Sequence, residues 1–347
     1  MHPVFLLLFV IHWLTRTDPV GSKQIGVGIQ PAIATDPGGR VHVVYGKGSA
    51  IFYTVSRDGH QFSAPVQIDS LAGLHLGASR GPQIAATAKS VVITAIDKSG
   101  NVWAYALNRA RGPWQPRVRL TDIPDVAKEG FVALSAGSDN VYNAVWLDLR
   151  TDNRNKLVGA RSTNGGRTWS ANQVLYQSPD GTVCECCQPS VVSQGKQVAV
   201  MFRNFLNGSR DMYLLQSRDG GHTFGKAEKL GQGTWKLNAC PMDGGGLSVA
   251  LNGAVTTVWR RENKLFAAKQ HQAETELGEG KNAKIVATKK GDYVVFQRAG
   301  QVMTLVPGET QPKTIAPGGY PKVALLSDDS VLCLWEQNGV VWAQIIQ

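Results

Sequence analysis

The 347-residue sequence has only five cysteines, no long hydrophobic run and no dense run of basic residues. Its one strongly apolar stretch, residues 4–14, is too short to cross a bilayer as a helix and is typical of the hydrophobic region of a secretory signal. We therefore expect residues 1–20 to be a signal peptide, with no stable membrane span, and the protein to be secreted or periplasmic. No Lys or Arg precedes the stretch and no A-x-A site follows it, so the cleavage position stays open.

Negative charge is also scarce relative to positive charge. The sequence has 36 Lys and Arg against 26 Asp and Glu, which gives a formal net charge of +10. This excess favours an anionic partner, such as an acidic glycan or another small anionic ligand, although solubility alone would also explain it. The basic residues are scattered and no basic run is interleaved with aromatic residues, so nothing indicates nucleic-acid binding.

A repeat runs through the rest of the chain. Segments of the type x-P-x-[IV]-A, followed by a turn and an apolar strand, recur near residues 31, 82, 189 and 321, with less regular copies near residues 131, 246 and 284. Each is followed by another short strand and a final extended stretch, which makes four strands per unit. We predict an all-β propeller of seven four-stranded antiparallel blades in one domain, residues 21–347. The last unit lacks a fourth strand, which the N-terminal "KQIGVGI" could supply.

Three turns carry a second signature: "SRDGHQF" at residues 56–62, "STNGGRTW" at 162–169 and "SRDGGHTF" at 217–224. They look like Asp boxes, in which Ser and Asp or Asn side chains bond nearby backbone groups and Gly permits a positive φ. We give these turns a structural role only. Asp boxes on four-stranded blades resemble the sialidase superfamily of β-propellers. Six blades are typical of that superfamily, so a six-bladed ring is the alternative to seven.

The resemblance implies a functional face opposite the Asp boxes, made by loops that lead into the inner strands and out of the second strands. Sialidases use three arginines around the sugar carboxylate, a tyrosine nucleophile with a glutamate, and an aspartic acid. The matching candidates here are Arg150, Arg203, Arg260 and Arg298 for binding the anion, and Tyr320, Glu336 and Asp148 for catalysis.

Two features complicate that match. Tyr320 stands before a proline, in the slot that Gln30 and Gln188 fill in other blades, so blade repetition is an alternative explanation for it. No F-R-I-P-type segment supplies a first arginine. The sequence therefore predicts an exported, monomeric, sialidase-like propeller that binds an anionic glycan. Whether it is an enzyme, a glycoside hydrolase of the exo-sialidase type, stays open.

The cysteines are concentrated in two loops. Cys184, Cys186 and Cys187 precede the fourth inner strand, and Cys240 and Met242 precede the fifth, so neighbouring blades should bring them together. In an exported protein a disulfide between Cys240 and the triplet is favoured. A Cu or Zn site is the second explanation, and a Cys nucleophile with His75 as base is the third. No cofactor is certain. The alternative function is a non-enzymatic extracytoplasmic binding protein whose cysteine loops hold a soft metal or brace the ligand face.

Overall fold

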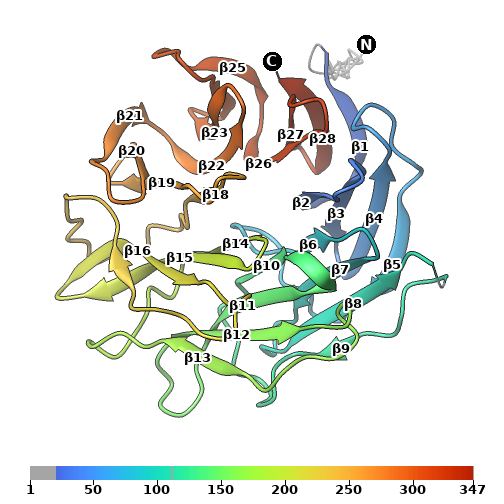
Figure 1. Cartoon of the computed structure of the whole chain (residues 1–347), viewed down its shortest axis with the longest axis horizontal. Coiled ribbons are helices and arrows are strands. Elements are labelled where there is room, and N and C mark those ends of the chain that lie inside the picture. Colours follow the sequence, from blue (N-terminus) through green and yellow to red (C-terminus); the bar gives the residue numbers. More distant parts are fainter. Residues whose placement is uncertain (1–20, 111, 347) are drawn as a thin grey trace, which may run out of the picture.

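The computed structural model describes residues 21–110 and 112–346, which form seven four-stranded sheets around a central axis (Figure 1). The predicted all-β propeller is confirmed, and the ring has seven blades, so the six-bladed alternative is wrong. The predicted signal peptide lies outside the described residues. Within them, the one helical element is the 3-10 turn η1 (Ser138–Asn140), and no helix is long and apolar enough to cross a membrane.

Each blade is an antiparallel sheet whose strands follow one another from the axis outward. Blade 1 contains β2 (Ile29–Thr35), β3 (Val41–Lys47), β4 (Ala50–Ser56) and β5 (Val66–Ser70). Blade 2 contains β6 (Gln83–Ala86), β7 (Ser90–Ile96), β8 (Val102–Asn108) and β9 (Val118–Arg119). Blade 3 contains β10 (Val132–Ala136), β11 (Tyr142–Asp148), β12 (Lys156–Ser162) and β13 (Gln173–Tyr176). Blade 4 contains β14 (Ser190–Gln194), β15 (Gln197–Leu206), β16 (Ser209–Ser217) and β17 (Glu228–Lys229).

The remaining blades have the same order. Blade 5 contains β18 (Gly246–Val249), β19 (Val255–Arg261), β20 (Lys264–Lys269) and β21 (Thr275–Glu279). Blade 6 contains β22 (Lys281–Thr288), β23 (Gly291–Arg298), β24 (Gln301–Leu305) and β25 (Lys313–Pro317). Blade 7 contains β26 (Gly319–Leu325), β27 (Val331–Gln337) and β28 (Val340–Ile346), and its outermost strand is β1 (Lys23–Val27) from the other end of the chain.

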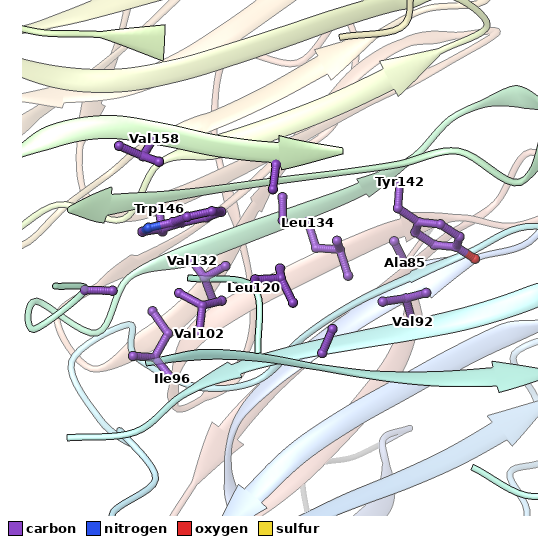
Figure 2. Close-up of a cluster of buried hydrophobic side chains, with 14 residues drawn as sticks. Ala85, Val92, Ile96, Val102, Leu120, Val132, Leu134, Tyr142, Trp146 and Val158 are labelled. Atoms are coloured by element: carbon purple, nitrogen blue, oxygen red, sulfur yellow. The ribbon is translucent and has the colours of Figure 1, made fainter. Parts of the chain in front are cut away.

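The hydrophobic core lies between blades. The second strand of a blade is covered on both faces, and in β7 every residue is buried, which suits its run of β-branched side chains. Figure 2 shows the cluster between blades 2 and 3, with Val102 near Val132 and Trp146, and Val92 near Tyr142. Because each blade packs only on its neighbours, the ring depends on being closed.

Closure comes from the N-terminal strand, as the sequence predicted. β1 pairs antiparallel with β28, with Lys23 opposite Ala343 and Val27 opposite Val340, and the two strands lie side by side in Figure 1. Gly26 is required here, because a Cβ at this position would lie 2.0 Å from Tyr45 Oη. The last blade is therefore completed by the first strand of the chain.

The Asp boxes are confirmed as turn-forming units. In the third one, Ser217 Oγ accepts a hydrogen bond from the Gly221 amide at 2.9 Å, and Asp219 Oδ1 accepts from the His222 and Thr223 amides at 3.0 Å. All three boxes follow the third strand of a blade. The loops that lead into the inner strands and the turns after the second strands lie at the opposite end of the sheets. We call that end the loop face.

Candidate functional site

A cavity of about 170 Å³ lies on the propeller axis and is lined by the inner strands of all seven blades. Its polar lining comes from Gln83, Gln188 and Ser190. Two lysines, Lys284 of β22 and Lys322 of β26, are the only charged residues in that lining. Other blades carry Ala32, Gln83, Ser190 or Gly246 at the equivalent position of the inner strand. The axial cavity is therefore cationic.

The two amines differ in their partners. Lys284 Nζ donates to the Gly245 carbonyl oxygen at 2.6 Å, whereas no hydrogen bond found in the described part of the chain uses Lys322 Nζ. Burial lowers the pKa of Lys322 to about 7; the neighbouring charge of Lys284 lowers it further, and the Glu336 carboxylate opposes both. Burial also lowers the pKa of Lys284. The charges of Asp243 and Glu336 oppose these shifts, but neither lysine forms an ion pair in the part of the chain that the structure describes.

The structure brings the predicted residues Tyr320 and Glu336 together beside Lys322. Gly319 pairs with Glu336 between β26 and β27, and Glu336 Oε2 accepts from the backbone amide of Gln30 and, at 3.3 Å, from its side chain. Burial raises the pKa of the Glu336 carboxyl, although the Gln30 hydrogen bonds and Lys322 lower it. Burial raises the pKa of Tyr320, and the negative charge of Glu336 raises it further. Glu336 thus joins blade 7 to blade 1 and holds no arginine.

The backbone at Tyr320 is shared with other blades. Its φ is 52°, close to the 55° of Gln30 and of Asn282, and a β-bulge interrupts the inner strand at the same place in all three blades. A positive φ in a residue with a side chain is uncommon, so the bulge imposes it. Blade repetition therefore accounts for the backbone of Tyr320, and only its side chain is special to blade 7.

Asp148 and Arg150 form a buried ion pair within blade 3. Asp148 is completely buried, and its two oxygens accept from Arg150 Nε at 2.8 Å and Nη2 at 2.9 Å and from Trp146 Nε1 at 2.9 Å. Arg150 Nη2 also donates to Asn172 Oδ1 at 2.9 Å. Neither residue lines the axial cavity. Their polar atoms hold the turn after β11.

Of the other three predicted arginines, Arg203 and Arg260 are neighbours against Trp235, and Arg298 lies in blade 6. Arg203 is 2% exposed and donates to the carbonyl oxygens of Arg210 at 2.7 Å, Asp243 at 3.1 and 3.2 Å, and Arg260 at 2.9 Å. Arg260 lies over the Trp235 ring, 5.7 Å from its centre, and Arg298 lies 6.0 Å from the Phe296 ring. None of the three lines the axial cavity. Arg203 ties blade 4 to blade 5 through backbone groups.

The three neighbouring cysteines meet in a buried cluster, which we call the thiol cluster: Cys184, Cys186 and Cys187. Cys184 Sγ lies 3.7 Å from Cys186 Sγ and 3.6 Å from Cys187 Sγ, and all three sulfurs lie within 4.8 Å of one another. Their exposed fractions are 0%, 4% and 2%. All three are free thiols, and the Cys184 amide donates to the Arg203 carbonyl at 3.1 Å, which fixes the loop on β15.

Arg210 at the start of β16 supplies positive charge to this cluster. Its Nη1 lies 3.0 Å from Cys184 Sγ and 3.1 Å from Glu185 Oε2, and its Nη2 lies 3.2 Å from Glu185 Oε1. Hydrogen bonding with the Cys186 and Cys187 thiols lowers the pKa of Cys184, and the charge of Arg210 adds to that effect. Burial raises the pKa of Cys187. Arg210 was not predicted from the sequence. Its only signal there is the charged pair in "GSRDMY", at the start of a strand.

Cys240 and Met242 belong to the neighbouring loop but are exposed, and Cys240 does not belong to the thiol cluster. The two loops meet through Arg210 instead: its amide donates to the Trp235 carbonyl at 2.8 Å and its Nε to the Leu237 carbonyl at 3.3 Å. The predicted convergence of the loops is thus present, with an arginine and not a sulfur as the contact. His75 packs against Gly130 in blade 3, where burial lowers its pKa.

A larger cavity, about 450 Å³, lies between blades 3 and 4 at the Asp-box end and is lined by Trp169, His222 and Phe224 among others. Its guanidinium group, Arg161, donates to the Gly220 carbonyl at 2.9 Å. This cavity holds no pair of charged groups like the axial lysines. The candidate sites on the loop face are therefore the axial lysine pair and the thiol cluster.

No protein-family profile and no curated protein matches the sequence. Solved structures match it in fold. Streptogramin B lyase aligns over 94% of this chain and 97% of its own, with a TM-score of 0.59 and 14% identity. An alpha-L-arabinanase from Penicillium chrysogenum, complexed with arabinobiose, aligns over 95% of this chain and 99% of its own, with a TM-score of 0.53 and 10% identity.

The NanB sialidase from Streptococcus pneumoniae is a weaker match, with a TM-score of 0.47 and 12% identity over 93% of this chain and 70% of NanB. At such identities a match shows the fold alone. The predicted propeller is therefore confirmed as an architecture that an arabinanase and a lyase share, and fold alone does not fix an activity.

Proposed function

We propose that the protein binds an acidic saccharide at the loop-face mouth of the axial cavity, with Lys322 and Lys284 holding the carboxylate. The observation that carries this proposal is that these two lysines are the only charged residues lining the cavity. Two ammonium groups in a partly enclosed space attract an anion, and the net charge of +10 favours its approach.

The size of the cavity limits what enters it. Its volume, about 170 Å³, is below the roughly 300–1,000 Å³ of pockets that enclose a drug-sized ligand. We expect only the acidic end of the saccharide to enter, while the rest lies across the loop face. The side chains of Gln83, Gln188 and Ser190 donate to backbone carbonyls, so their oxygens are left to accept hydrogen bonds from hydroxyl groups. The arabinanase with bound arabinobiose supports a saccharide ligand by analogy of fold.

We propose binding without hydrolysis. The aspartic acid candidate, Asp148, is completely buried and both of its oxygens are engaged by Arg150, so it does not serve as the acid in this proposal. Tyr320 and Glu336 then act as positioning residues at the rim, because Glu336 is held by Gln30 and lies beside Lys322. The soft-metal alternative concerns the thiol cluster, which is a separate part of the loop face.

Calorimetric titration with glucuronate, galacturonate and sialic acid tests the proposal, with arabinobiose and galactose as neutral ligands. We expect an acidic sugar to bind, and Lys322→Met to weaken it at least tenfold. Lys290→Met is the matched control, since Lys290 is exposed at the Asp-box end. Affinity should rise as the pH falls from 8 to 6, because the pKa of Lys322 is about 7.

Three results would contradict this proposal. The first is that no acidic sugar binds, and the second is that Lys322→Met binds as well as the wild type. The third is turnover of a fluorogenic sialoside that is lost in Tyr320→Phe, which would make the protein a hydrolase and not a binding protein.

A further inference from the structure

The spacing of the thiol cluster fits a metal ion. In a metal centre with sulfur ligands at about 2.3 Å, the sulfurs lie about 3.8 Å apart in a tetrahedron and about 4.0 Å apart in a plane. The sulfurs here lie 3.6 and 3.7 Å apart, and all three fall within 4.8 Å of one another. Shifts of less than about one ångström would therefore let all three contact one ion.

A disulfide between the adjacent cysteines Cys186 and Cys187 does not suit this geometry. The two sulfurs of a disulfide lie about 2.05 Å apart and its Cα atoms usually about 4.4–6.8 Å apart. Cys186 and Cys187 are adjacent, and adjacent Cα atoms lie about 3.8 Å apart across a trans peptide. Cys240 could bridge to the cluster only if its exposed side chain turned inward past Arg210.

The surroundings can neutralise the charge of a thiolate centre. Three thiolates around a monovalent ion carry a net charge of −2, which is costly to bury without a counterion. Arg210 lies 3.0 Å from Cys184, and the fully buried Arg203 is close enough to Cys187 to act on it electrostatically. The two arginines offset these two negative charges, and Glu185, which pairs with Arg210, brings one further negative charge that is 37% exposed and therefore solvated.

The number of donors selects among soft metals. Thiolates suit both zinc and Cu(I), but structural zinc sites take four ligands. No fourth His, Cys, Asp or Glu joins the three sulfurs among residues 21–110 and 112–346. We propose that Cys184, Cys186 and Cys187 hold one Cu(I) ion in a buried three-sulfur site on the loop face. On binding, the metal displaces the thiol protons, which leave to solvent.

The test is a titration of the reduced, metal-free protein with Cu(I) under anaerobic conditions, against a chromophoric chelator of known affinity. We expect one Cu(I) per chain and an X-ray absorption spectrum with three sulfur ligands. Cys184→Ser, Cys186→Ser and Cys187→Ser should each weaken binding at least 100-fold. Cys240→Ser is the matched control and should bind like the wild type, because Cys240 is exposed and outside the cluster.

Because serine in a buried site destabilises the fold, each variant is checked by circular dichroism, and Arg210→Gln provides a test that leaves all three sulfurs in place. We expect Arg210→Gln to weaken Cu(I) binding at least tenfold while the stoichiometry stays at one.

Other results overturn the proposal. Zinc bound by four sulfurs and lost in Cys240→Ser would mean a four-cysteine zinc site. A count of three thiols instead of five in the unfolded, copper-free protein would mean a disulfide. Binding at the same level in wild type and the cluster variants would mean an adventitious ion only.

Discussion

Replacement of Lys322 by Met should stabilise the fold. Lys322 lines the axial cavity without a hydrogen-bonding partner found in the described part of the chain, and burial together with Lys284 lowers its pKa from 10.5 to about 7. The Lys322 amine binds its proton less tightly in the folded state than in the unfolded state, so protonation of this amine destabilises the fold. Methionine has a similar length and no charge, so it removes this cost.

The magnitude follows from the pKa. One pKa unit corresponds to about 1.4 kcal/mol, so the full shift of Lys322 corresponds to at most about 5 kcal/mol. The side chain is only half-buried and the cavity admits water, so we expect a gain of about 2 kcal/mol. The effect should be complete below about pH 7, decrease as the pH rises, and vanish above about 10.5, where the lysine is neutral in both states.

Urea denaturation of wild type and Lys322→Met at pH 6.5, 8.5 and 10 measures this directly. Other titrating groups cancel in the difference between the two proteins at each pH. Lys290→Met is the control for replacing an exposed lysine and should change the free energy of unfolding by less than about 0.5 kcal/mol. The reasoning is refuted if Lys322→Met is less stable than wild type at pH 6.5, or if its gain is the same at every pH.

Three further changes test the fold around the candidate sites. Ile25→Ala in β1, a buried contact of the closing strand, should lower the free energy of unfolding by about 2–5 kcal/mol, whereas Val27→Ala in the same strand, 49% exposed, should have little effect. Gly244→Ala would place a Cβ 1.8 Å from the Gln188 carbonyl oxygen, so urea denaturation should show a loss of about 3 kcal/mol or more. Arg203→Met leaves three backbone carbonyls without their donor and should cost about 3 kcal/mol, while Arg298→Met should cost less than about 0.5 kcal/mol. If Arg203→Met and Arg298→Met have the same free energy of unfolding, Arg203 does not stabilise the packing of blade 4 on blade 5.

The fold was predictable from the sequence because each blade buries its apolar strands in the same way. An apolar second strand recurs in all seven blades, a proline slot in four and a Ser-x-Asp or Ser-x-Asn turn in three, and each has one local meaning. The pairing of β1 with β28 followed by counting, since six blades had four strands and the last had three. The proximity of the three cysteines of the thiol cluster was also predictable, because they are close together in the sequence.

The candidate site was less predictable, because a strand-end arginine looks the same whichever way its donors point. Arg203 and Arg150 satisfy carbonyl and carboxylate groups of the fold, and only three-dimensional structure shows this. Lys284 and Lys322 were missed for the converse reason: a lysine in a short strand usually faces solvent, and here the ring of blades encloses it. Comparison of equivalent positions across the seven repeats would have exposed both lysines, since the other blades have no charge there.

The two proposed sites are physically linked through one residue. Gln188 directly follows Cys187, lines the axial cavity, and donates from Nε2 to the Val132 carbonyl at 3.0 Å. A metal that fixes the thiol cluster must also restrict Gln188, so Cu(I) binding should tighten binding of an acidic sugar, and the sugar should tighten Cu(I) binding by the same factor. Calorimetry with copper-loaded and copper-free protein measures that factor, which we expect to be about fivefold, or ~1 kcal/mol. Because the thiols stay reduced in both samples, equal sugar affinities would mean that Gln188 is already held by Val132 and Gly244, and that the two sites act independently.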